Sequence, residues 1–188
     1  MSRWRMAALA VAFAAAACAT PGLPPPAPSA FDLSGRVLAG YDGRAFSSGL
    51  RWQHVPHRDE IWLLTPLGQA LAHIVSTDEG ATVTGADRNQ YQGADVEALT
   101  RQALGWELPL TRLQYWVRGE VAPGSAPRNV QRDPEGRLTG LVQDEWHITL
   151  EYPEGEFRRL PRRVELRRAN ESIRLVIDAW RSEPTAAP

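Results

Sequence analysis

Residues 31–54 read FDLSGRVLAGYDGRAFSSGLRWQH and show most clearly how this chain folds. In the first half, apolar residues such as Leu33 and Val37 stand at alternate positions among polar ones, and the second half has the same period around Trp52. A period of two residues is typical of a β-strand with one buried face. Because Asp42-Gly43 can form a tight turn, the stretch predicts an antiparallel hairpin.

Further segments on the C-terminal side have the same period or the same turn signals. We predict additional strands at residues 60–65, 69–76, 81–85, 89–92, 138–143, 146–152, 164–166 and 173–179. Residues 94–104 instead have a period near 3.6, with Gly105 placed to end a helix. A second helix is predicted from Pro109 to Gly119, since proline is favoured in a first helical turn.

These elements predict a mainly β domain with some α structure. About ten strands with one apolar face, covered by only two short helices, must form a sheet that curls on itself. We therefore expect an incomplete antiparallel β-barrel, closed by a helical lid around a hydrophobic interior. The inward residues suit either a filled core or a cavity for an apolar ligand, and the residue pattern leaves both open.

Composition excludes several functional classes. The chain has 188 residues, of which 43% are hydrophobic, so it can bury a core, and its net charge of -1 disfavours a nucleic-acid-binding role. Every positively charged residue is arginine, so the chain has no lysine for Schiff-base chemistry or for a P-loop. Its single cysteine, Cys18, excludes an internal disulfide.

The N-terminal region predicts export and lipid attachment. Residues 1–17 have two early arginines and then an uncharged, alanine-rich run, as in a signal peptide. Cleavage after Ala17 would leave Cys18 at the mature N-terminus, where a bacterial lipoprotein carries its acyl chains. Residues 18–30 are rich in proline and predict an extended tether, followed by a domain over 31–182 and a flexible tail over 183–188.

No catalytic, metal or cofactor site is predicted. The chain lacks G-x-S-x-G, glycine-rich phosphate-binding and H-E-x-x-H motifs. His54 and His57 have an H-x-x-H spacing, but Pro56 interrupts it, so we interpret them as structural. A basic cluster could contact phosphate groups, although a solvated strand face explains it better; it consists of Arg158, Arg159, Arg162, Arg163, Arg167 and Arg168.

The turn between the strands at 60–65 and 69–76 has an unusual residue. Thr65-Pro66-Leu67-Gly68 fits a type I turn, which places Leu67 at the tip of a hairpin. A polar residue is the usual choice at such a tip. The residues alone leave two interpretations open: an incidental exposed leucine, or one that contacts a membrane or a partner.

Several stretches together resemble the LolB family, whose members are outer-membrane receptors that accept lipoproteins from the periplasmic carrier LolA. The stretches span Phe31 to about Arg181, and their order along the chain is specific. They are Phe31-x-Leu33-x-Gly35-Arg36-Val37, Leu50-x-Trp52, Leu63-Leu64-Thr65-Pro66-Leu67-Gly68-Gln69, Leu104-Gly105, Leu108-Pro109-Leu110, Leu113-x-x-Trp116-x-x-Gly119, Gln143-x-x-Trp146, Leu160-Pro161 and Ile177-x-x-Trp180.

The resemblance implies a function as well as a fold. Cys18 would be acylated and would hold the protein at the periplasmic face of the outer membrane, while Leu67 would enter the bilayer during delivery. The implied partners are a LolA-like carrier, the acyl chains of lipoproteins and outer-membrane phospholipid, with the protein acting as a monomer and not as an enzyme. We expect the acyl chains to lie against Val37, Leu50, Trp52, Leu64, Trp116, Trp146, Ile148, Leu175 and Ile177.

Other readings of the sequence remain. The chain could be an envelope lipoprotein that binds another apolar ligand, or a structural lipoprotein whose sheet encloses a filled core. An enzyme that uses carboxylates outside any motif, such as Asp59 and Glu60, fits the sequence least well. Acyl chains that co-purify with the domain would favour a carrier or receptor.

Overall fold

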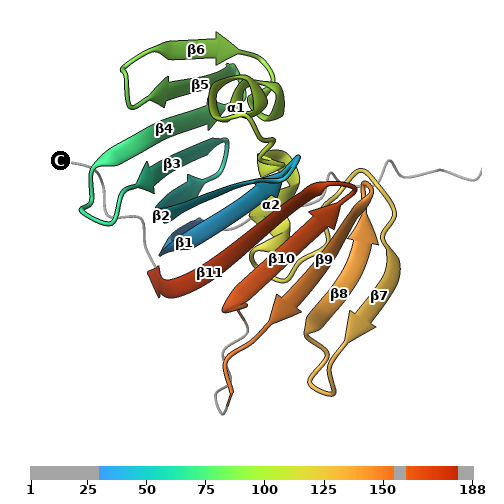
Figure 1. The fold of residues 1–188 in the computed structure, drawn as a ribbon. Helices are drawn as coiled ribbons and strands as arrows, with labels where there is room; N and C mark the ends of the chain where they lie inside the picture. Colours follow the sequence, from blue (N-terminus) through green and yellow to red (C-terminus); the bar gives the residue numbers. More distant parts are fainter. Residues whose placement is uncertain (1–29, 155–159, 182–188) are drawn as a thin grey trace, which may run out of the picture.

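The computed structural model describes residues 30–154 and 160–181, which form one antiparallel sheet of eleven strands with two helices on one face (Figure 1). The helices are α1 (Val96–Leu104) and α2 (Leu110–Trp116). The strands are β1 (Phe31–Tyr41), β2 (Arg44–Val55), β3 (Arg58–Leu64), β4 (Ala70–Thr77), β5 (Gly80–Gly85), β6 (Gln90–Gly93), β7 (Arg128–Arg132), β8 (Leu138–Gln143), β9 (Trp146–Glu151), β10 (Arg163–Arg168) and β11 (Glu171–Arg181).

The hairpin predicted from residues 31–54 is confirmed. β1 and β2 pair in one continuous register, and Asp42 and Gly43 both have positive φ, as a tight hairpin turn requires. On its other side β1 pairs with β11, the last strand, so that Val37 lies opposite Leu175. The first and last strands therefore join the two halves of the sheet.

The sheet is open: its two edge strands do not pair with each other to close a barrel in the described part of the chain. Its strands follow the order β6-β5-β4-β3-β2-β1-β11-β10-β9-β8-β7, so β6 and β7 are its edges, and no pairing joins them within residues 30–154 and 160–181. The chain between these edges forms the helices instead, and they cover the inner face (Figure 1). The predicted antiparallel, mainly β architecture is right, and the open sheet supports the predicted incomplete barrel only in part.

β7 is a strand that the sequence pattern did not predict. All five of its residues are exposed, so it has no alternation of apolar and polar positions. Its pairing with β8 is interrupted by register shifts, and Asn129 has positive φ. Irregular and charged edge strands of this kind resist pairing with other chains.

The residues at the two ends of α1 explain where this helix begins and ends. The Asp95 carboxylate accepts hydrogen bonds from the backbone N–H groups of Glu97 and Ala98, at 3.0 and 3.2 Å, and so caps the first turn. At the other end Gly105 has φ of 84°, and a side chain there would clash with the Tyr41 hydroxyl. The second predicted helix is confirmed with a small difference: Pro109 is its N-cap and not its first helical residue.

Removing the Asp95 cap is expected to destabilise the protein by about 1 kcal/mol, because Asp95→Ala leaves helix N–H groups without a partner. The hydrogen bond from Ala98 lowers the pKa of Asp95 below its ordinary 3.8. The stabilising effect is therefore complete above pH 3.8 and is lost as the pH falls through the lowered pKa. Denaturant unfolding at several pH values measures both effects.

Asp95→Asn is the matched control, because asparagine caps a helix equally well and carries no charge. It should keep the stability at neutral pH and lose the pH dependence that comes from this residue. Equal unfolding free energies for Asp95→Ala and the wild type would show that the cap contributes nothing.

The core lies between the inner face of the sheet and the segment that runs from α1 to α2. We call α1, α2 and residues 105–109 between them the helical lid. Buried lid residues such as Leu99, Trp106 and Leu113 form one cluster with the inward side chains of the strands. Within residues 30–154 and 160–181, no helix is both long enough and apolar enough to cross a membrane.

Candidate functional site

Eight of the nine predicted ligand-lining residues lie together in the core. Trp116 comes from α2, and the others come from β1, β2, β9 and β11, which lie in the middle part of the sheet with β10 between β9 and β11. All are buried members of the same hydrophobic cluster: Val37, Leu50, Trp52, Trp116, Trp146, Ile148, Leu175 and Ile177. The predicted strand parity is right at these positions.

Leu64 is the exception, and its predicted place on the inner face is wrong. Leu63 is 1% exposed and pairs with the inward-facing Leu50, whereas Leu64 pairs with Gly49 and is only partly buried. Because successive strand residues point to opposite faces, Leu64 lies on the outer face. Two consecutive leucines make the alternation ambiguous, and only the pairing with β2 resolves it.

The inner face is packed, with no open channel along these residues. Trp116 is 0% exposed, and Trp52 and Leu175 are each 1% exposed, so a water molecule cannot touch them from outside or from an enclosed space. Side chains of the helical lid occupy the concavity of the sheet. An apolar ligand can therefore reach this face only if the lid moves.

A buried amide ties one side of the lid to the sheet. Gln143, on β8, accepts hydrogen bonds from Trp116 Nε1 at 2.8 Å and from the Ala122 backbone N–H at 3.1 Å. Its own amide nitrogen donates to the backbone carbonyls of Ala122 and Ser125, at 2.7 and 2.9 Å. The sequence motif Gln143-x-x-Trp146 contained this residue but gave no sign of its role, because its partners lie about twenty residues away.

The histidines have carboxylate partners that the sequence did not reveal. His54 Nδ1 lies 2.9 Å from Asp59 Oδ1, which also accepts a hydrogen bond from Trp52 Nε1 at 2.6 Å. His73 Nε2 lies 2.9 Å from Glu60 Oε1 on the neighbouring strand. These contacts support the structural interpretation of His54. They also show that the carboxylates of Asp59 and Glu60 hold side chains of neighbouring strands.

The Leu67 turn has the geometry that the sequence predicts. The Thr65 carbonyl accepts from the Gly68 N–H at 2.9 Å, the Thr65 hydroxyl accepts from the Gln69 N–H at 3.1 Å, and Gly68 has positive φ. Leu67 is 87% exposed at the tip. The turn is therefore held by its backbone and by Thr65, and the Leu67 side chain takes no part in holding it.

The antiparallel pairing places five turns at one end of the sheet: 42–43, 65–69, 86–89, 144–145 and 169–170. We call this end the Leu67 rim. The connection between the helices reaches the same rim, because Gly105 lies against Tyr41 and the Trp106 ring centre is 6.0 Å from that of Phe46. An exposed leucine and the middle of the helical lid thus share one end of the molecule.

Sequence comparison identifies the family of this chain. A family model described as "Outer membrane lipoprotein LolB" matches residues 29–180. The chain belongs to the LolB family. Among its relatives are the outer-membrane lipoprotein LolB of Chromobacterium violaceum, 36% identical over 94% of this chain and 98% of that protein, and that of Thiobacillus denitrificans, 35% identical over 96% and 99%.

A solved structure also aligns with the fold of this LolB-family chain. It is the LolA superfamily protein NE2245 from Nitrosomonas europaea, with a TM-score of 0.49 and 9% identity over 84% of this chain and 88% of that one.

Membership of the LolB family makes this protein an outer-membrane lipoprotein with a role in lipoprotein localisation. The predicted signal peptide, Cys18 and the tail at 183–188 lie outside the described residues, as do Arg158 and Arg159 of the basic cluster. In the described part of that cluster, Arg163 and Arg167 pair with Glu151 and Glu165. Arg168 instead reaches the helical lid.

Proposed function

We propose that this protein accepts lipoproteins from a LolA-like periplasmic carrier, holds their acyl chains between the helical lid and the sheet, and passes them to the outer membrane. The observation that carries the proposal is the position of Leu67, 87% exposed at the rim that the middle of the lid also reaches. An exposed leucine at the tip of a hydrogen-bonded turn suits contact with the acyl region of a bilayer, because burial of its side chain there is favourable.

The transfer makes and breaks no covalent bond in this proposal. Each methylene group that leaves water contributes about 0.8 kcal/mol, so an apolar face under the lid attracts an acyl chain. The chain must displace packed side chains such as Leu113 and Trp116, and this cost offsets part of the gain. Because the lid packs again once the chain has left, the bilayer remains the more favourable destination.

Cys18 is proposed as the anchor. Two or more acyl chains hold a protein on a bilayer far more firmly than one. The intact mass of the protein extracted from membranes is expected to match a chain that begins at Cys18 and carries lipid. An unmodified N-terminus, or a mature chain that begins elsewhere, would contradict this assignment.

A reconstituted transfer assay tests the proposed function. The full-length protein is placed in liposomes, a LolA-like carrier loaded with a radiolabelled lipoprotein is added, and the label on sedimented liposomes is measured. We expect label to move to liposomes that contain the protein and to stay on the carrier when they lack it. Equal transfer to both kinds of liposome would overturn the proposal.

The same assay separates the rival readings. A lipoprotein that binds some other apolar ligand would bind a free fatty acid but leave the cargo on the carrier. A structural lipoprotein would bind neither, as its packed interior would then be permanent. The packed interior fits a receptor only if the lid can open, so the contacts that hold the lid closed bear directly on function.

A further inference from the structure

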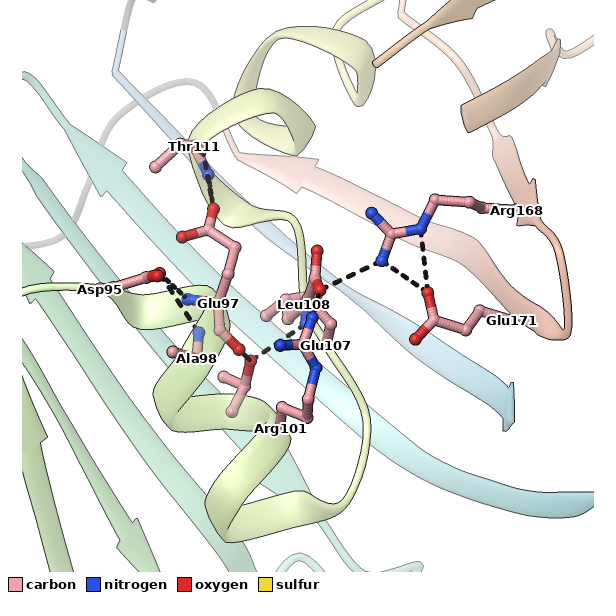
Figure 2. Close-up of polar contacts among 10 residues, drawn as sticks. Asp95, Glu97, Ala98, Arg101, Glu107, Leu108, Thr111, Arg168 and Glu171 are labelled. Carbon is pink, nitrogen blue, oxygen red and sulfur yellow. Dashed lines mark hydrogen bonds and ion pairs between the residues drawn. The ribbon is translucent and has the colours of Figure 1, made fainter. Parts of the chain in front are cut away.

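An ion-pair network joins the helical lid to the far half of the sheet (Figure 2). Glu107, in the connection between the helices, lies 3.1 Å from Arg168 at the end of β10. Arg168 also binds Glu171 at 2.6 Å, and its guanidinium carbon lies 4.4 Å from the centre of the Trp146 ring. The carboxylate of Glu107 pairs as well with Arg101 of α1.

Hydrogen bonds join the two helices of the lid to each other and to the connection between them. Glu97 of α1 accepts hydrogen bonds from the backbone N–H and the hydroxyl of Thr111 in α2, at 3.0 and 2.8 Å. The Thr100 hydroxyl accepts from the Leu108 N–H at 3.0 Å. Figure 2 shows these contacts on the lid side and Arg168 on the sheet side. The pair Glu107–Arg168 therefore joins the lid to β10, on the half of the sheet away from the strands β5 and β6 that α1 packs against.

When this ion pair breaks, each of the two charged side chains still has another partner. Glu107 keeps Arg101, and Arg168 keeps Glu171 and the face of Trp146. The two side chains are 10% and 24% exposed, so water and salt reach the pair. Because the pair is largely but not fully buried and each partner keeps a second contact, its net contribution is modest and salt screens it in part. It can open and close again, unlike the buried hydrogen bonds that Gln143 makes with Trp116 and Ala122.

We propose that the Glu107–Arg168 pair is a latch that controls how readily the helical lid opens to admit and release an acyl chain. This inference rests on the proposed function. The latch lies at the Leu67 rim, since Arg168 and Glu171 flank the turn at 169–170. The lid then opens where residues 105–109 meet the ends of β10 and β11, while the Gln143 contacts, two strands away at the same end of the sheet, continue to hold the end of α2.

Two measurements on the full-length protein in detergent micelles test the latch. Hydrogen exchange of peptides covering residues 96–116 reports lid opening without any ligand, and a fluorescent C16 fatty acid reports acyl uptake. Glu107→Gln, and independently Arg168→Gln, should raise both rates about two- to fivefold, as expected for loss of a partly exposed pair. In the wild type both rates should rise with salt, and in the variants this dependence should weaken.

Glu165→Gln is the matched control. Glu165 pairs with Arg174 at 2.7 Å on β10 and β11, so its loss removes a similar ion pair that does not touch the lid. This variant should exchange, bind and respond to salt as the wild type does. Unchanged exchange of residues 96–116 in both latch variants, or an equal increase in Glu165→Gln, would overturn the latch.

The two measurements separate the latch from the proposed function. Faster exchange with no fatty-acid uptake in any variant would support the latch as a structural element and count against an acyl-binding interior. Fatty-acid uptake that is equal in all variants, with equal exchange, would keep the acyl-binding interior and reject the latch.

Discussion

A Leu67→Glu protein is expected to fold normally and to lose delivery of lipoproteins into membranes. Leu67 is 87% exposed, and the backbone and Thr65 hold the turn without its side chain. The free energy of unfolding should therefore change by no more than about 0.5 kcal/mol, as for other surface substitutions. Acceptance of cargo from the carrier should continue, because Leu67 lies outside the packed interior.

Delivery should fail because a carboxylate at the tip must lose its water to enter the acyl region. A charged residue at the bilayer centre costs about 2.5–3.5 kcal/mol or more, which reverses the preference of a leucine. Cargo should then stay bound to the variant in the reconstituted assay. The measurement is the share of label in liposome lipid against the share that co-purifies with the protein.

Val130→Glu is the control for adding a carboxylate to an exposed apolar position. Val130 is 43% exposed on the edge strand β7, away from the Leu67 turn in the strand order. This variant should deliver cargo as the wild type does. If Leu67→Glu also folds and delivers at the wild-type rate, Leu67 has no part in the mechanism.

Ile148→Asp is expected to damage the interior and lower the free energy of unfolding by several kcal/mol. Ile148 is 2% exposed on β9, between Leu166 of β10 and Leu141 of β8. An unpaired carboxylate there is buried among apolar groups, and such burial is among the most costly single changes. Denaturant unfolding followed by tryptophan fluorescence measures the loss.

His147→Asp is the matched change on the opposite face of the same strand. His147 is exposed and lies opposite Arg167 on the neighbouring strand β10. The positive charge of Arg167 is favourable for a carboxylate at position 147. Its unfolding should stay close to that of the wild type. Equal stability of Ile148→Asp and His147→Asp would show that the inner and outer faces of β9 have been assigned wrongly.

Local patterns in the sequence predict the features that depend on neighbouring residues. The hairpin at 31–54, the helix that ends at Gly105 and the Leu67 turn are all determined by a few adjacent side chains. β7 could not be predicted in this way, because an exposed edge strand has no apolar face. Which face of the sheet Leu64 points to is decided by its pairing with Gly49 of β2, and this pairing cannot be seen in the local sequence.

The sequence predicts which residues face the interior better than it predicts how tightly that interior is filled. Alternation places Trp52, Trp146 and Leu175 on one face, but it carries no information on whether helices fill the space above them. The role of Arg168 depends on a contact with Glu107, 61 residues earlier in the chain, that no periodicity encodes. The arginine cluster therefore looked like a solvated face, which describes Arg163 and Arg167 but not Arg168.

The pairing of β1 with β11 also fixes the direction from which a tether enters the domain. Phe31 begins β1 at the end of the sheet opposite the Leu67 rim, but the register places Leu64 at the level of Arg36, so the Leu67 turn lies only roughly 25 Å from Phe31 along the strands. Residues 18–30 can span at most about 43–47 Å when fully extended. A domain held by Cys18 therefore has length to spare when the Leu67 turn faces the bilayer, and only the loss of about half of this segment would keep Leu67 out of reach while the anchor stayed intact.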